Sequence, residues 1–144
     1  MTFWHINILT DDVEKTIDFL CATQGSTRDK WIVVDLEFSD DVMVIGDGGK
    51  LRAAFGRVGG IVYELMQPLD DKSYHAQQLK ARGPGFHHSA YVCAENLDET
   101  VKNLIAAGGR IVWQAHPGNE RCYYIESDGV VMEVINVCPI MPEE

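Results

Sequence analysis

The pattern of hydrophobic and polar positions predicts two amphipathic helices, one in each half of the chain. "DDVEKTIDFL" (residues 11–20) and "ENLDETVKNL" (residues 95–104) align without gaps and share apolar positions at the i, i+4 and i+7 spacing of a surface helix. Both start with residues at the spacing of an N-terminal capping box: Asp11 with Glu14, and Asn96 with Glu99. The glycines of "AGG" at 107–109 then predict where the second helix ends.

Strand-like runs surround each predicted helix in the same order. Each helix follows a short strand that begins at a histidine, "HINIL" from His5 and "HSAYV" from His88. Each half closes on an apolar strand with a single glutamate, "IVYELM" around Glu64 and "VVMEVI" around Glu133. Between helix and closing strand lie further apolar runs typical of strands: "WIVVDLEF", "KLRAAF", "RIVWQ" and "CYYIE". Each half is therefore predicted to be a βαβββ module.

This internal repeat predicts the domain organisation. The first module spans 1–68 and the second 85–144, and the polar segment 69–84 is predicted as a linker with a short helix over 73–81. A chain of 144 residues suits one ordinary domain. We therefore predict an α+β fold in which the two modules pair into one curved mixed sheet and form one structural domain.

Composition and charge narrow the classes of partner. The net charge of −10, from 12 basic and 22 acidic side chains, disfavours binding to nucleic acid or to an anionic membrane. No apolar run approaches the ~18 residues of a membrane span, and no signal peptide is evident. The four cysteines lack CxxC spacing and lie in mostly apolar surroundings, which favours buried free thiols and a cytoplasmic protein.

Two histidines and two glutamates are the candidate chemistry. A carboxylate inside an apolar strand is costly unless it has a partner. If the two modules pack about a pseudo-twofold axis, His5 and Glu64 face His88 and Glu133, and together they suit a divalent ion such as Zn, Ni, Co, Fe or Mn. Two carboxylates also balance the charge of that ion. Taken singly, each glutamate is equally well interpreted as a solvent-facing residue, and a lone strand histidine is more often a core or surface residue than a ligand.

His87 and His88 are adjacent on one predicted strand, where neighbouring side chains point to opposite faces. Only one of them is therefore expected to enter the site. Four motifs, in this order, cover nearly the whole chain: "HINILTDDVEKTIDFL", "YELMQPLDDKS", "RGPGFHHSAYVCAENLDETVKNLIAAGGR" and "SDGVVMEVI". With them the sequence resembles the vicinal oxygen chelate superfamily, which includes glyoxalases, bleomycin-resistance proteins and dioxygenases, and is most similar to its methylmalonyl-CoA epimerase-like branch.

The resemblance implies a metal site with the ligands His5, Glu64, His88 and Glu133, and it turns His87 to the opposite face. It also implies that the ion chelates two neighbouring oxygens of a small carbonyl or acyl-thioester substrate. Glu133 or Glu64 would then act as the base that forms an enolate, as in a lyase or isomerase of the glyoxalase or epimerase type. Glyoxalase I enzymes carry glutamate at the position of Glu64, whereas epimerases often carry glutamine. A homodimer is expected from the same resemblance.

One departure from the resemblance weakens a strict methylmalonyl-CoA epimerase activity. Epimerases of this branch carry an additional glutamate base on the third strand of the first module, where this sequence has Arg52. An arginine cannot act as a base near neutral pH, but it can bind a substrate carboxylate. Arg121 lies in a loop that borders the pocket in relatives and is a second candidate substrate contact. His75 and His116 are expected to be solvated loop residues.

Two other functions are compatible with this resemblance. Iron held by two histidines and a carboxylate can activate oxygen, which would make the protein a metal-dependent oxygenase. Bleomycin-resistance relatives sequester a ligand without catalysis. Extradiol dioxygenases generally keep only one carboxylate ligand, and bleomycin-resistance relatives typically lack the four ligands. The sequence therefore favours the metal-dependent lyase or isomerase.

Overall fold

Two βαβββ modules build one curved sheet, as the repeat predicts. The computed structural model describes residues 1–144. Its strands are β1 (Thr2–Leu9), β2 (Ile32–Glu37), β3 (Met43–Ile45), β4 (Lys50–Val58), β5 (Ile61–Pro68), β6 (Gly85–Val92), β7 (Arg110–Ala115), β8 (Cys122–Ser127) and β9 (Val130–Ile135). The helices are α1 (Val13–Cys21), α2 (Tyr74–Arg82) and α3 (Leu97–Ala106), with short 3-10 turns at Arg28–Lys30 and Asp40–Val42.

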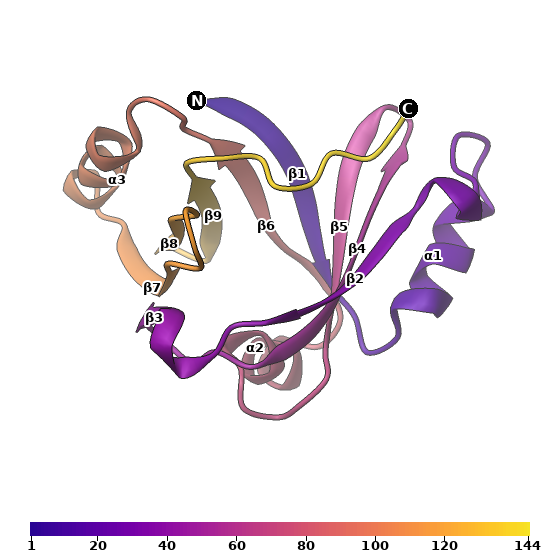
Figure 1. Ribbon diagram of the computed structural model, residues 1–144, viewed down its shortest axis with the longest axis horizontal. Helices are drawn as coiled ribbons and strands as arrows, with labels where there is room; N and C mark the ends of the chain where they lie inside the picture. Colours follow the sequence, from indigo (N-terminus) through magenta and orange to yellow (C-terminus); the bar gives the residue numbers. More distant parts are fainter.

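The nine strands form a single mixed sheet in the order β2-β4-β5-β1-β6-β9-β8-β7-β3. In each module the first strand lies parallel to the last, β1 beside β5 and β6 beside β9. The two modules join where β1 pairs antiparallel with β6. Figure 1 shows the sheet curled into a half-barrel, with α1 and α3 on its outer sides. The predicted fold class is therefore confirmed.

Helices α1 and α3 cover the outer face and leave the inner face free for a cavity. The apolar positions of α1, including the buried Val13 and Ile17, pack against Ala54 and Leu65 of the first module. Those of α3 pack in the same way against the second module: Leu97 and Val101 with Cys93, Ile125 and Val134. This packing explains the i, i+4 spacing of apolar residues in the sequence.

The caps of these helices differ from the capping boxes that the spacing predicts. In α1 the N-cap is Asp12, not Asp11, and its side chain accepts a hydrogen bond from the backbone N–H of Lys15 at 3.1 Å. Two consecutive aspartates offer the same side-chain chemistry, so spacing alone could not choose between them. The side chain of Asn96 makes no capping hydrogen bond at the start of α3.

Strand β3 was not predicted, and it forms the edge of the sheet opposite to β2. The chain leaves β2 at one edge and forms β3, which pairs with β7 at the other edge through Met43 opposite Ala115 and Ile45 opposite Gln114. Figure 1 shows this segment running below the half-barrel. The strand has only three residues, too few to show a period of two.

The C-terminal tail crosses from β9 to the first module (Figure 1). The indole Nε1 of Trp4 donates to the carbonyl of Ile140 at 3.0 Å, and Arg57 Nε donates to the carbonyl of Pro142 at 3.1 Å. All four cysteines are free thiols, and Cys138 in this tail is exposed rather than buried as predicted. None of the three helices is long and apolar enough to cross a membrane.

Candidate active site

Three of the predicted ligand residues meet on the inner face of the sheet. His5 on β1, His88 on β6 and Glu133 on β9 place one ligand atom each within 4.8 Å of one another. Both histidines are fully buried, and Glu133 is 6% exposed. His5 Nε2, His88 Nε2 and Glu133 Oε1 have no hydrogen-bond partner. Because unpartnered buried polar atoms are costly, this group fits a divalent metal ion, which would satisfy all three atoms at once.

Glu64 lies beside this group without being part of it. Its Oε1 atom is 3.3 Å from His5 Nε2, whereas Oε1 of Glu133 is 3.7 Å from the same nitrogen. Asn7 Nδ2 donates to Glu64 Oε1 at 2.7 Å and holds that carboxylate in place. Glu64 as fourth ligand stays a prediction. Asn7 was missed by the sequence analysis, although it lies two residues after His5 and therefore on the same face of β1.

The charged groups of the site alter one another's pKa values. Burial raises the pKa of Glu133 to about 7, and the neighbouring charge of Glu64 adds to the rise, while His5 and the Cys122 thiol oppose it. Burial lowers the pKa of His5, but the carboxylates of Glu64 and Glu133 outweigh this and leave it above its ordinary value. The Cys122 thiol donates to Glu133 Oε2 at 3.1 Å. A divalent ion would displace the protons that this group holds.

The prediction that His87 turns away from the site is wrong. The pairing of β6 with β1 jumps from His88 opposite Asn7 to Phe86 opposite Ile8, which leaves His87 as the extra residue of a β-bulge. Both imidazoles are buried, and their Nδ1 atoms lie 2.7 Å apart. Regular alternation does not hold across a bulge. His87 therefore contacts His88 directly.

Side chains from α2 complete the surroundings of this histidine pair. Tyr74 Oη lies 3.2 Å from His87 Nε2, and His75 Nε2 lies 2.8 Å from Tyr124 Oη. The Tyr124 ring packs on His88 with ring centroids 4.6 Å apart. The prediction that His75 is a solvated loop residue is wrong, because the first turn of α2 enters the core and leaves His75 only 1% exposed. His116 is exposed, as predicted.

His75 gives the fold a specific sensitivity to acid. Burial, with the nearby His87, lowers the pKa of His75 to about 3, against about 6.5 in an unfolded chain. Below pH 6.5 the unfolded chain takes up a proton here that the folded protein does not, so acidification destabilises the fold by about 1.4 kcal/mol per pH unit. We expect His75→Gln to reduce the pH slope of the unfolding free energy by one proton between pH 6 and 4.

Urea unfolding at a series of pH values in EDTA measures that slope. Tyr124→Phe is the control, because it removes the hydrogen bond to His75 but keeps the titrating imidazole, and it should retain the wild-type slope. An unchanged slope in His75→Gln would contradict the assignment.

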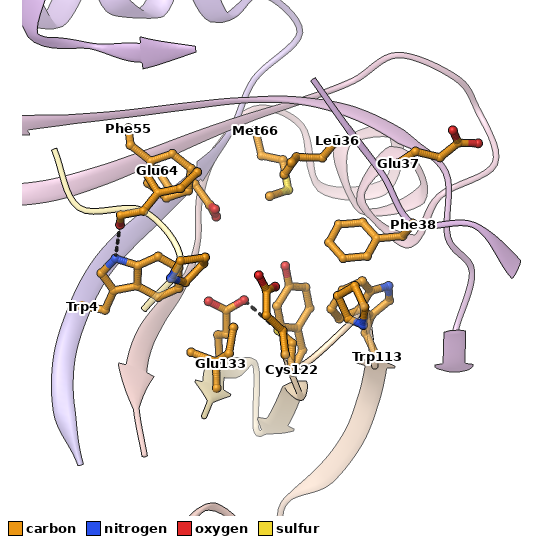
Figure 2. Close-up of a pocket in the computed structure, with 16 residues that line it drawn as sticks. Trp4, Leu36, Glu37, Phe38, Phe55, Glu64, Met66, Trp113, Cys122 and Glu133 are labelled. Carbon is orange, nitrogen blue, oxygen red and sulfur yellow. Dashed lines mark hydrogen bonds between the residues drawn. The ribbon is translucent and has the colours of Figure 1, made fainter. Parts of the chain in front are cut away.

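A cavity of about 260 Å³ opens on the concave face next to these residues. Ten of its 16 lining residues are hydrophobic, and the remainder include Glu64 and Glu133 from the site. Figure 2 shows both carboxylates pointing into the space between the aromatic walls, whereas the side chain of Glu37 points away from it. Glu120 and Cys122 also line the cavity. The sequence analysis expected the loop of Glu120 and Arg121 to border the pocket but chose Arg121 as the substrate contact. It missed Cys122, whose only signal is its alternation with Tyr124 on β8.

The two arginines proposed as substrate contacts do not line the cavity. Arg52 shares the outer face of β4 with Ala54, and its Nε atom pairs with Asp35 Oδ1 at 2.8 Å. Arg121 Nη1 pairs with Asp98 Oδ1 at 2.8 Å. Neither guanidinium belongs to the group formed by His5, His88 and Glu133. Their substrate-binding role stays a prediction that the placement of the two side chains does not support.

Comparison with solved structures gives the same fold over nearly the whole chain. Methylmalonyl-CoA epimerase from Mycobacterium tuberculosis is 27% identical, with 96% of this chain and 89% of that chain covered and a TM-score of 0.66. A hypothetical protein from Bacillus halodurans is 18% identical, with 97% and 96% covered and a TM-score of 0.67. A variant of Streptomyces coelicolor methylmalonyl-CoA epimerase in complex with 2-nitronate-propionyl-CoA is 22% identical, with 94% and 93% covered and a TM-score of 0.63.

Sequence comparison identifies the family. A comparison with curated protein sequences finds no match. The profile of the glyoxalase/bleomycin resistance protein/dioxygenase superfamily matches residues 4–125, which include both βαβββ modules up to β8. This match covers most of the chain and agrees with the fold of the solved relatives. The chain therefore belongs to the glyoxalase/bleomycin resistance protein/dioxygenase superfamily.

Proposed function

We propose that this protein is a metal-dependent lyase or isomerase of the glyoxalase or epimerase type. Its substrate would be a small carbonyl or acyl-thioester compound with two neighbouring oxygens. The observation that carries the proposal is the convergence of three buried residues, His5, His88 and Glu133, each with an unpartnered side-chain atom, beside a cavity. Glu64 is the proposed fourth ligand.

The chemistry proposed for this site is proton removal next to a carbonyl group. When bound, a divalent ion of zinc, nickel, cobalt, iron or manganese supplies Lewis acidity, which stabilises the negative charge of an enolate. Glu133 is the proposed base, because its carboxylate lines the cavity and burial brings its pKa to about 7. Glu64 is the second candidate base, held by Asn7. The apolar walls exclude water and strengthen the electrostatic interactions inside.

An iron-dependent oxygenase is the second candidate function. The group that converges most closely contains two histidines and one carboxylate, which is also the ligand set of iron sites that activate oxygen. Oxygen uptake by the iron-loaded protein would favour this candidate. Exchange of a substrate α-proton in D₂O without oxygen uptake would favour the lyase or isomerase. A protein that only sequesters a ligand would have no use for the buried ligand atoms.

Metal binding is the first test of the proposed function. After dialysis against EDTA, the protein is expected to bind one Zn²⁺ or Co²⁺ per chain in calorimetry. Metal at about 100 times its dissociation constant should stabilise the fold by about 2.7 kcal/mol, which raises the Tm by roughly 9 °C. Saturable binding with no rise in Tm, or no binding of any ion of this series, would contradict the proposal.

The homodimer and the cytoplasmic location stay predictions. So does the division at residues 68 and 85, which we retain as the proposed boundary between the modules and their linker. In the structure α2 (Tyr74–Arg82) occupies that linker.

A further inference from the structure

The cavity carries negative charge and no basic side chain. Four glutamates are among the lining residues, and no lysine or arginine is. Glu64 and Glu133 belong to the candidate metal site, and Glu37 is exposed with its carboxylate turned outward (Figure 2). Glu120 remains as a further carboxylate on the wall.

The charges around the cavity disfavour an anionic ligand. With Glu64 as the proposed fourth ligand, two carboxylates neutralise a divalent ion, and Glu120 makes the loaded cavity negative overall. Burial raises the pKa of Glu120, which shows that this wall already disfavours a negative charge. A substrate carboxylate or phosphate placed here would be another buried anion without a basic partner, and such groups are strongly disfavoured.

The walls present flat aromatic surfaces. Trp4 and Phe55 stack with ring centroids 5.9 Å apart and planes 13° apart. Trp113 and Tyr124 stack at 4.5 Å and 27°. Figure 2 shows Trp4 and Phe55 on one side of the space and Trp113 with Phe38 on the other. A volume of about 260 Å³ between such walls suits a small ring-containing compound.

The surface beyond the cavity is also unfavourable for phosphates. The protein has a net charge of −10. Of its 12 lysines and arginines, five are held in ion pairs with acidic side chains: Arg28, Arg52, Lys72, Arg110 and Arg121. The phosphates of a coenzyme A thioester need basic partners, which these side chains do not offer while paired.

We infer that the cavity takes a small, uncharged aromatic compound and discriminates against anionic acyl groups such as methylmalonyl-CoA. The expectation that this compound has two neighbouring oxygens rests on the proposed function. The expectation that it is uncharged and aromatic rests on the lining residues alone. The solved relatives that are methylmalonyl-CoA epimerases would then share the fold with this protein but not its substrate class.

A matched pair of probes tests this inference. 2-Naphthol and 2-naphthoate have the same ring system and differ in charge at pH 7. In equilibrium dialysis the protein as purified is expected to bind 2-naphthol more tightly than 2-naphthoate by about tenfold or more. Equal affinity, tighter binding of the carboxylate, or no binding of 2-naphthol would overturn the inference. Repeating the comparison in EDTA, which removes bound metal, tests whether the preference for 2-naphthol comes from the lining side chains, as expected.

Two charge-reversed variants locate the source of the preference. Glu120→Lys is expected to narrow the ratio of the two affinities to about threefold or less, because it supplies a cation inside the cavity. Glu37→Lys makes the same change in charge on a side chain turned to solvent and should leave the ratio near the wild-type value. A ratio that stays unchanged in Glu120→Lys would contradict the inference. Metal titration is a separate measurement, so failure of the proposed function is recognised independently.

Discussion

Replacement of Glu133 by glutamine is expected to lower the affinity for Zn²⁺ or Co²⁺ by about 100-fold or more, while the protein stays folded. The substitution keeps the shape of the side chain but removes the one negative charge in the buried His5–His88–Glu133 group. It also removes the proposed base, so α-proton exchange on any responsive substrate should fall to the background rate. Calorimetric metal titration and proton exchange in D₂O measure the two effects.

The same variant should be more stable than the wild type when both are free of metal. Because burial raises the pKa of Glu133 to about 7, the ionised carboxylate is disfavoured in the folded protein, and stability falls as the pH rises from about 4.5 to 7. At pH 8 in EDTA we expect Glu133→Gln to have a free energy of unfolding about 1–3 kcal/mol higher than that of the wild type, as measured by urea unfolding. Glu37→Gln, on an exposed side chain, is the control and should change neither stability nor metal affinity. Wild-type metal affinity in Glu133→Gln would refute the assigned ligand.

Replacement of His87 is expected to weaken metal binding by about 10- to 100-fold, although His87 is not itself a predicted ligand. His88 can direct a lone pair on Nε2 toward an ion only if its proton is on Nδ1. His87 Nδ1, 2.7 Å away, would then accept that hydrogen bond, and His87 would donate from Nε2 to Tyr74 Oη at 3.2 Å. With this set of tautomers, the bulge residue His87 orients the imidazole of His88.

His87→Phe and Tyr74→Phe separate positioning from packing. His87→Phe keeps a ring of similar size but has no nitrogen to receive the proton, so the loss of metal affinity should appear in a folded protein. Tyr74→Phe removes only the outer hydrogen bond and should weaken metal binding by no more than about threefold. Circular dichroism and thermal unfolding in EDTA check the fold of both variants. A folded His87→Phe protein with wild-type metal affinity would show that His87 has no positioning role.

Much of the fold could be predicted because its signals are local and periodic. Val13, Ile17, Leu97 and Val101 are buried at the spacing that predicts α1 and α3. His5, His88 and Glu133 were found because a polar residue inside an apolar strand stands out, and because the repeat puts them in equivalent places. Their convergence follows from the pairing of β1 with β6 and of β6 with β9.

The remaining features depend on interactions between distant segments. The bulge at His87 is an irregularity of pairing with β1, and an alternation rule applied to one strand cannot detect it. The burial of His75 requires α2 to enter the core, whereas its local sequence is polar. Arg52 was placed by alignment, and its partner Asp35 lies on the neighbouring strand β2. Glu120 comes from a loop, where no periodicity indicates which way a side chain points.

The pairing of β3 with β7 gives the two halves of the chain a second connection besides that of β1 with β6. β3 is synthesised before β4 and β5 but pairs with a strand of the other half. Its backbone donors and acceptors therefore have no strand partner until β7, which ends at Ala115, has been synthesised. A fragment cut at the linker would expose an unsatisfied edge on each piece. The two similar units are thus linked twice, through β1 with β6 and through β3 with β7, which favours folding of the whole chain as one unit.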